Sequence, residues 1–316
     1  MMNEKPIESL DCENVVSAVI RVRNAAAHLQ RCLSGLKRQI LPASYQLQVI
    51  VVDNNSTDDS LAVARRYGAA VVPVQRDEFT WGSALNKGIA LAVGRIVLLL
   101  SSDTYAPDSR WLGEMLKPFP DPCVAAVYGR QVPYRDAPVD ERVRLKKRFP
   151  PTSMRFDANN SDPHPSGRGI IVSNACAAIR RSVWQQVPYD EQISGGEEGV
   201  WSCDILKRGY TIVYQATAKI YHSHRDNPLK QAWRHWELRA REGLFSNGQS
   251  NQAASLRWLG AFAKRRLQNC LYPGVPIRSR VEGIAVLPVE LAAFALVDFI
   301  PKKHMEPSKL KRLFWR

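Results

Sequence analysis

Residues 49–60 read VIVVDNNSTDDS, an apolar run that ends abruptly in acidic and amide side chains. Four consecutive β-branched residues, 49–52, predict a strand buried on both faces, as in a parallel sheet. The acidic pair at 58–59 stands where a helix N-terminus favours such residues. In open α/β sheets, ligands bind beyond the carboxyl ends of the strands. The turn at Asp53 and Asn54 is therefore either a binding loop for a base and a ribose or an ordinary capped connection.

A second apolar run ends in the same way. Residues 95–100 (RIVLLL) predict a buried strand, and Ser101, Ser102 and Asp103 follow it. A carboxylate just past a buried strand can bind a divalent cation or a sugar hydroxyl, and oxygen ligands suit Mg²⁺ or Mn²⁺. The other interpretation is that Asp103 caps a helix in the segment that runs to Trp111.

Strands and helices alternate through the first hundred residues. The expected strands are 15–22, 49–52, 69–74 and 95–100, and the expected helices lie around 29–36, 61–67 and 82–93. This alternation predicts an α/β fold with a mostly parallel central sheet flanked by helices and right-handed crossovers. Further on, strands are expected at 124–128, 170–179, 210–214 and 218–221, with a turn at 129–133, a charged helix at 141–148 and a long functional loop at 150–169.

Composition fits a cytoplasmic enzyme. The 316 residues are 45% hydrophobic, and the six cysteines form no CxxC pair, so reduced thiols are expected. The chain starts without an apolar signal region. A net charge of +14 calls for an anionic partner, which could be a nucleoside diphosphate, a nucleic acid or an acidic membrane surface.

Several motifs occur in an order that resembles the family-2 nucleotide-sugar glycosyltransferases, whose fold is of the GT-A type. The resemblance covers residues 15–225. The motifs are the 53–60 turn, Asn86-Lys87-Gly88, the Asp103 turn, Glu197-Glu198, and His222 with His224. Four short segments resemble the rhamnosyltransferase branch of that family: 100–103 (LSSD), 129–133 (GRQVP), 173–175 (SNA) and 196–201 (GEEGVW).

The resemblance implies a chemistry. The enzyme would transfer a sugar from a nucleoside diphosphate to a glycan or lipid-linked acceptor, with inversion at the anomeric carbon. The expected donor is dTDP-rhamnose, and the expected pathway is cell-surface polysaccharide synthesis. Glu198 would be the catalytic base, and Glu197 would support the loop that carries it. Asp103 would hold Mg²⁺ or Mn²⁺ under the diphosphate, with His222, or alternatively His224, as a further ligand.

The same resemblance implies the binding residues. The nucleotide-sugar site would contain Arg21, Asn24, Asp53, Asn54, Trp81, Asn86, Ser102, Asp103 and Arg130. The acceptor site would contain Asn174 and Trp201.

Some residues depart from the family pattern. Many relatives carry two carboxylates in the metal turn, whereas Ser101 stands at the first position here. The charge of the leaving diphosphate could therefore fall to Arg130 or Arg168 instead. The two histidines would share one face of a strand, with their Cα atoms about 6–7 Å apart. Both side chains therefore reach one ion only if the strand bends there.

The C-terminal part falls outside the resemblance. We therefore expect a catalytic domain at 1–225 and a separate basic helical region at 226–316. This region is expected to start with a basic, tryptophan-bearing helix, followed by a polar linker at 247–253. Residues 284–300 are apolar but contain Pro288, Glu290 and Asp298 and are short for a membrane span, so a core or interfacial helix is expected. The basic, aromatic tail at 301–316 would suit an anionic leaflet, which predicts peripheral contact with the inner face of the cytoplasmic membrane.

Two other functions compete. A nucleotidyltransferase could use a similar sheet, although the Glu-Glu and His motifs argue against it. A non-enzymatic nucleic-acid-binding protein is suggested by charge alone and lacks a recognisable module, so no nucleic-acid partner is expected. The sequence leaves the oligomeric state open.

Overall fold

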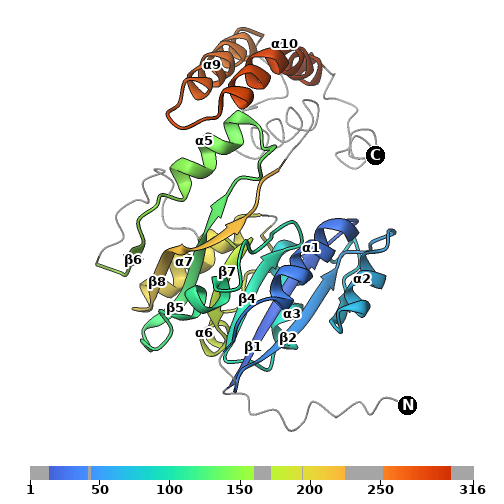
Figure 1. Ribbon diagram of the computed structural model, residues 1–316, viewed down its shortest axis with the longest axis vertical. Coiled ribbons are helices and arrows are strands. Elements are labelled where there is room, and N and C mark those ends of the chain that lie inside the picture. Colours follow the sequence, from blue (N-terminus) through green and yellow to red (C-terminus); the bar gives the residue numbers. More distant parts are fainter. Residues whose placement is uncertain (1–13, 42–43, 160–171, 194, 225–251, 300–316) are drawn as a thin grey trace. The chain divides into compact units, whose positions relative to one another are not determined.

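The computed structural model describes residues 14–41, 44–159, 172–193, 195–224 and 252–299. The described strands form one sheet in the order β3-β2-β1-β4-β7-β5-β8-β6 (Figure 1). Arg168, the basic segment at 226–246, most of the expected linker at 247–253 and the tail at 301–316 lie outside the described residues.

The strands are β1 (Val15–Val22), β2 (Gln46–Asp53), β3 (Ala70–Pro73), β4 (Ile96–Ser101), β5 (Val124–Val132), β6 (Met154–Phe156), β7 (Cys176–Arg180) and β8 (Thr211–Tyr221). The helices are α1 (Ala26–Lys37), α2 (Ser60–Arg66), α3 (Trp81–Ala90), α4 (Trp111–Leu116), α5 (Val139–Arg148), α6 (Arg181–Gln186), α7 (Glu197–Lys207), α9 (Gln252–Cys270) and α10 (Ile277–Phe299).

The first half of the sheet is parallel, as the alternating pattern predicts. β1 pairs in parallel with both β2 and β4, and β2 pairs in parallel with β3. In this register Val22 lies opposite Asp53, and Arg21 lies opposite Ser101. The carboxyl ends of the three central strands therefore meet at one edge, where the sequence places its polar turns.

Two strands run against the others. β7 lies between β4 and β5 and is antiparallel to both, and β6 is antiparallel to β8. Because Leu100 pairs with Cys176, the residues that enter β7, including Asn174, lie at the edge where β4 ends. The expected mostly parallel α/β sheet is confirmed, and the reversed strand brings a distant segment to the same edge.

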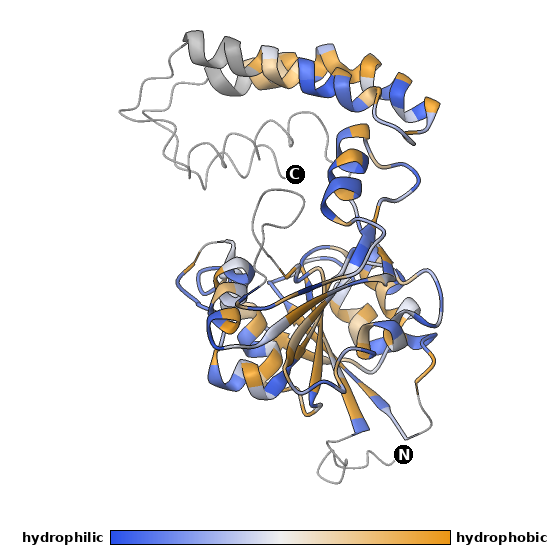
Figure 2. Ribbon diagram, turned by 90° about the vertical axis from the view of Figure 1, so that its left-hand side faces the viewer, coloured by the Kyte–Doolittle hydropathy of each residue, from blue (hydrophilic) through white to orange (hydrophobic). Residues whose placement is uncertain are grey.

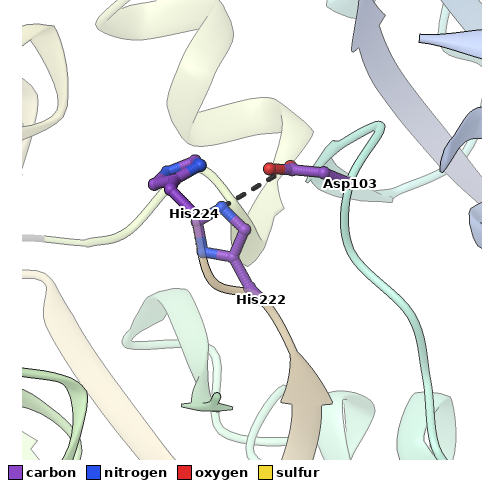
Figure 3. A group of neighbouring side chains, drawn as sticks. All are labelled: Asp103, His222 and His224. Atoms are coloured by element: carbon purple, nitrogen blue, oxygen red, sulfur yellow. Dashed lines mark ion pairs between the residues drawn. The ribbon is translucent and has the colours of Figure 1, made fainter. Parts of the chain in front are cut away.

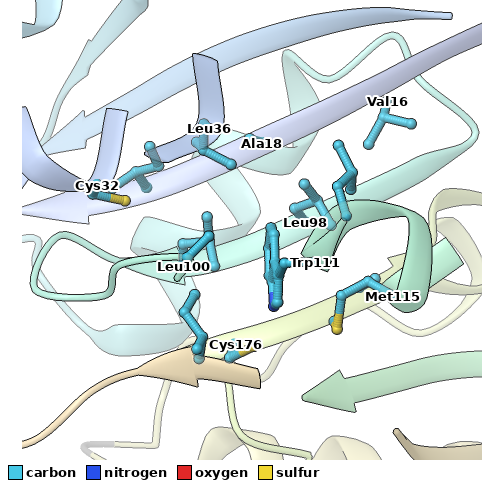
Figure 4. Packing of buried hydrophobic residues seen from close by; sticks show 14 of the residues in the cluster. Val16, Ala18, Cys32, Leu36, Leu98, Leu100, Trp111, Met115 and Cys176 are labelled. Carbon is cyan, nitrogen blue, oxygen red and sulfur yellow. The ribbon is translucent and has the colours of Figure 1, made fainter. Parts of the chain in front are cut away.

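Helices cover both faces of the sheet, which explains its continuous apolar strands. One face of β1, with Val16, Ala18 and Ile20, packs in a core with residues of α1, α2 and α4, among them Trp111 (Figure 4). On the other face, α3 approaches so closely that a Cβ at Gly88 would lie 2.5 Å from Val19 Cγ1. Figure 2 shows the apolar colouring of these central strands.

The turn expected at 129–133 is wrong. β5 continues through Val132, and β8 pairs with it across a shift from Gln215 to Lys219. This irregularity joins the strands expected at 210–214 and 218–221 into one. A Cβ at Gly129 would lie 2.6 Å from Ala218 O, so the glycine marks a close approach of two strands.

Two smaller expectations also change. The strand expected at 170–179 is confined, among the described residues, to β7, and the loop expected at 150–169 contains β6. Asp58 does not cap α2 in the ordinary way. Its Oδ1 accepts from the backbone nitrogen of Ser60 and its Oδ2 from that of Ala26, so it connects the starts of α1 and α2.

The chain divides into two compact units. The first contains residues 1–132 and 146–222, and the second contains 133–145 and 223–316. The segment 133–145, which lies within the catalytic domain expected at 1–225, is part of the second unit.

Helices α9 and α10 form the described body of the second unit, together with the start of α5. The rings of Phe262 and Phe294 pack at 4.7 Å between centroids. The buried Arg266 pairs with Asp140 of α5, at 2.6 Å from Nη1 to Oδ2, and with Glu290 of α10. Among the described helices, none has the length and apolar character needed to cross a bilayer.

Candidate active site

Asp103, His222 and His224 bring their ligand atoms within 4.8 Å of one another (Figure 3). Asp103 follows the end of β4, and both histidines follow the end of β8. His222 Nε2 lies 3.5 Å from Asp103 Oδ1. Two imidazoles and one carboxylate are donors that a divalent first-row cation accepts, whereas Mg²⁺ favours oxygen ligands. The donor set therefore fits a transition ion such as Mn²⁺ better than Mg²⁺.

A hydrogen-bond chain fixes the orientation of His222. Gln131 Nε2 donates to Ser173 Oγ at 2.6 Å, so its Oε1 is left to accept from His222 Nδ1 at 2.7 Å. His222 is 7% exposed and Gln131 4% exposed. A ligating histidine commonly donates its other ring nitrogen in this way, which leaves Nε2 as the ligand atom.

The condition for both histidines to reach one ion, a departure from regular strand geometry, is met. β8 ends at Tyr221, and His222 N then donates to Val132 O, so the histidines lie beyond the regular strand. Both can therefore reach one ion. The N-cap interpretation of Asp103 is also wrong, because α4 begins at Trp111 with Arg110 as its N-cap.

Arg21, at the end of β1, lies between an acid and an aromatic ring. Its Nη1 is 3.7 Å from Glu197 Oε1, and its guanidinium carbon lies 4.8 Å from the centroid of the Trp81 ring. Burial lowers the pKa of Arg21, while the charges of Glu197, Glu198 and Asp103 act in the opposite direction. The acidic pair and Asp103 thus lie close enough to the guanidinium of Arg21 for their charges to affect its pKa.

Glu197 and Glu198 stand in the first turn of α7, where the helix dipole favours negative charge. Gly196, the N-cap, has φ 86°, a left-handed conformation that glycine adopts without strain. Glu197 is buried, and this burial together with the Glu198 charge raises its pKa to about 7 against the opposing effect of Arg21. Glu198 is half-buried and faces solvent in part.

A buried aromatic layer supports this acidic turn. Tyr189 and Trp201 stack with 5.3 Å between ring centroids, and Trp201 Nε1 donates to Val187 O at 2.7 Å. Trp201 is 2% exposed, so in this structure it packs beneath the site and offers no face to an acceptor. Tyr189 OH donates to Asn174 Oδ1 at 3.0 Å, and Asn174 Nδ2 has no hydrogen-bond partner among the described residues.

The β2 turn presents unpaired acceptors. Asp53 Oδ2 accepts from Ser56 N at 3.1 Å, whereas Asp53 Oδ1 and Asn54 Oδ1 are buried and lack a partner within the described chain. Buried polar atoms are normally hydrogen-bonded, so these two oxygens are candidates to accept hydrogen bonds from a ligand. On β5, Arg130 Nε is also buried without a hydrogen-bond partner in the described part.

The remaining expected donor-site residues serve partly internal purposes. Asn24 Oδ1 accepts from Thr57 N at 2.7 Å and connects the turns after β1 and β2. Ser102 is 8% exposed, and its backbone nitrogen donates to Arg21 O. Trp81, at the start of α3, is 44% exposed and available to a ligand.

Asn86 has its side chain occupied by a distant segment. Its Nδ2 donates to Tyr189 O at 2.8 Å and to Glu191 Oε1 at 2.9 Å. Its Oδ1 accepts from Trp184 Nε1 at 2.8 Å and from Tyr189 N at 3.1 Å. These contacts tie α3 to the segment that leads into the acidic turn of α7.

The structure adds three residues to the site that the sequence did not predict there: Gln131, Tyr189 and Glu191. Gln131 lies within the GRQVP piece at 129–133, which carried a family resemblance but no assigned role. Tyr189 and Glu191 have no local pattern that marks them, because their partners lie in α3 and before β7.

Comparison with known proteins identifies the family. The model of the glycosyl transferase family 2 matches residues 17–187, more than half of the chain. The chain is 31% identical over 193 residues to the O-antigen chain rhamnosyltransferase WbaN of Salmonella anatum, covering 60% of this chain and 61% of WbaN. It is 26% identical over 227 residues to RfbN of Salmonella typhimurium, another O-antigen chain rhamnosyltransferase, covering 70% of each chain.

Solved structures share the fold. The mannosyltransferase PcManGT from Pyrobaculum calidifontis, in complex with GDP-Man and Mn²⁺, aligns with a TM-score of 0.54 at 18% identity, covering 91% of this chain and 88% of its own. The 1–349 portion of TarS from S. aureus aligns with a TM-score of 0.52 at 15% identity, covering 90% of this chain and 90% of that portion. The GT-A fold expected from the sequence is confirmed, and the chain belongs to glycosyl transferase family 2.

Proposed function

We propose that this protein transfers a sugar from a nucleoside diphosphate donor to a hydroxyl of a glycan or lipid-linked acceptor, with inversion at the anomeric carbon. The observation that carries the proposal is the convergence of three groups at one sheet edge. These groups are the Asp103–His222–His224 cluster, the buried Arg21 and the acidic start of α7, and the charges of Asp103 and of the α7 acids both influence Arg21.

The leaving group gains negative charge as the glycosidic bond breaks. A divalent cation held by Asp103, His222 and His224 would supply Lewis-acid stabilisation of the diphosphate. Asp53 Oδ1 and Asn54 Oδ1 would receive hydrogen bonds from the base and ribose, since both are buried and unpaired in the described structure. Trp81, partly exposed and next to Arg21, would line the donor sugar.

The acceptor hydroxyl must lose a proton on the face opposite the leaving group. Glu198 is the residue we assign as general base, because it is partly exposed and so can be reached by an acceptor. Glu197 is turned into the protein against Arg21 and would hold the turn in place. Asn174, whose Nδ2 is buried and unpaired, would contact the acceptor side.

Rhamnose, as dTDP-rhamnose, is the donor sugar we propose, because the two O-antigen relatives are named rhamnosyltransferases. Their naming also supports an acceptor in cell-surface polysaccharide synthesis. The setting would be the cytoplasm, at the inner surface of the membrane where a lipid-linked acceptor is exposed. For the cation we propose Mn²⁺, the ion named in the PcManGT complex, because two imidazole ligands suit a first-row transition ion better than Mg²⁺.

Release of nucleoside diphosphate from a panel of nucleotide sugars, without acceptor, tests this proposal. We expect dTDP-rhamnose to be hydrolysed fastest, chelator to stop release, and Mn²⁺ to restore it more fully than Mg²⁺. Asp103→Asn should weaken donor binding. Glu198→Gln should lower kcat of transfer by about 10²–10⁴ while leaving donor affinity nearly intact.

Other outcomes would contradict specific parts. Pyrophosphate release from nucleoside triphosphates, with no nucleotide sugar turned over, would indicate a nucleotidyltransferase. Full activity in excess chelator would show that basic side chains stabilise the leaving group. A Glu198→Gln variant that keeps more than about a tenth of wild-type turnover would exclude Glu198 as the base.

A further inference from the structure

The helices of the second unit expose an unusual amount of apolar surface. Within the described residues, seven of the eleven exposed large hydrophobic side chains lie on α9, α10 or the turn between them. These are Leu267, Leu271, Ile277, Val281, Ile284, Val286 and Val289. Scattered single hydrophobic residues are normal on a protein surface, but a cluster indicates an interaction site.

Four of them form a stripe along α10. Ile277, Val281, Ile284 and Val289 are 78%, 60%, 52% and 59% exposed. The spacings of four and three residues place Ile277, Val281 and Ile284 in line along an α-helix, and Val289 lies at the flank of this line. We call this stripe the outer face of α10.

The opposite side of α10 is packed and partly charged. Ser279, Glu290 and Phe294 are buried there, and Glu290 pairs with the buried Arg266 of α9. The core that α10 forms with α9 is apolar too, so this helix is apolar on both sides, whereas a water-exposed helix normally has a polar outer side. The outer face of α10 is therefore apolar where a purely solvent-facing helix would be polar.

The charge of the region indicates what could cover this face. Residues 223–316 contain seventeen Lys and Arg against seven Asp and Glu, a surplus of ten that makes up most of the net charge of +14. Lys264, Arg265 and Arg278 are exposed on the two helices themselves. Arg278 also pairs with Glu282 at 2.8 Å, an exposed pair worth little by itself.

We propose that the outer face of α10 docks on the surface of an anionic lipid bilayer, with the helix lying in the interface. Apolar side chains then enter the headgroup boundary while basic residues meet anionic headgroups. A second copy of the chain fits less well, because a twofold contact through this face would bring two strongly basic regions together. The docking itself is independent of catalysis. Its consequence, access to a lipid-linked acceptor, rests on the proposed function.

Vesicle sedimentation of the full chain tests the proposal. Vesicles of phosphatidylcholine mixed with phosphatidylglycerol should bind the protein at low salt, with binding falling as salt rises. Phosphatidylcholine alone should bind it weakly. Val281→Asp/Ile284→Asp should weaken partitioning by at least about tenfold, because two aliphatic side chains no longer enter the boundary. Affinity for dTDP should stay unchanged.

The matched control is Ile40→Asp/Leu91→Asp, which places the same charges on exposed aliphatic positions of the first unit. This variant should bind vesicles nearly as well as wild type. Equal loss in both double variants, or none in Val281→Asp/Ile284→Asp, would overturn the assignment of the surface. Equal binding to both kinds of vesicle would overturn its anionic character.

Light scattering of the lipid-free protein completes the test. A dimer that Val281→Asp/Ile284→Asp dissociates, without vesicle binding by wild type, would show that a second copy covers the face and would overturn the proposal. Inactivity towards every nucleotide sugar, with vesicle binding retained, would instead overturn the proposed function alone.

Discussion

At the residue scale, Glu197 carries a carboxylate that the first turn of α7 places out of reach of water. It is 4% exposed, and burial and the neighbouring Glu198 raise its pKa from 4.5 to about 7. The folded protein therefore binds this proton more tightly than the unfolded chain does. By linkage, the stability contributed by Glu197 is fully present below about pH 4.5 and is lost as pH rises through about 7.

Glu197→Gln removes this titration and so isolates it. The free energy of unfolding of wild type, minus that of the variant, should fall across the window from about pH 4.5 to about 7. The total fall should be up to roughly 3 kcal/mol, and the difference should level off above this pH window. Urea unfolding of both proteins at several pH values measures it, since other titrating groups cancel in the difference. A difference that does not change with pH would mean that Arg21 keeps Glu197 ionised throughout.

At the element scale, Asn86 joins α3 to the segment before α7. Asn86→Asp would replace the Nδ2 donor by an oxygen facing two acceptors, Tyr189 O and Glu191 Oε1. Displacement of the acidic turn should lower kcat by about 10- to 100-fold with little change in donor affinity. Steady-state kinetics and dTDP titration measure the two effects separately.

Glu191→Gln supplies the control for this prediction. Alone it keeps an oxygen to accept from Asn86 Nδ2, so it should resemble wild type. In Asn86→Asp/Glu191→Gln the glutamine amide can donate to the new carboxylate, and kcat should partly recover. If Asn86 binds the donor directly, as the family resemblance implies, the Asn86→Asp variant loses donor affinity and the second substitution does not restore it.

At the scale of the whole molecule, two compact units predict two unfolding transitions. Arg266 is 1% exposed and lies between Asp140 and Glu290 in the second unit. Arg266→Met should destabilise that unit by about 3–5 kcal/mol, because it leaves acidic groups without their cation. Calorimetry should show one transition moving down while the other, which dTDP raises, stays in place.

Arg266→Met/Glu290→Leu is the matched variant. It removes the buried pair and leaves Asp140, which is 30% exposed by side chain and also accepts from Asn269 Nδ2. Much of the lost stability should return, since replacing a buried pair with apolar groups is often neutral. A single transition that moves as one in Arg266→Met would contradict independent unfolding of the units.

The parallel half of the sheet follows from local patterns in the amino-acid sequence. Runs such as 49–52 and 95–100 are apolar throughout because helices cover both of their faces, and this signal is local. It also predicted that Asp53 and Asp103 follow strands whose carboxyl ends meet, which the register confirms by placing Val22 beside Asp53 and Arg21 beside Ser101.

The continuation of β5, the grouping of the metal ligands and the arrangement of α10 depend on contacts between segments that are distant along the chain. Val132 stays in the strand because β8 pairs with it across a bulge, and His222 and His224 reach Asp103 because β8 ends just before them. Glu290 lies on the buried side of α10 because Arg266 of α9 pairs with it there. Each outcome depends on a partner far along the chain, and periodicity within one segment carries no information about such partners.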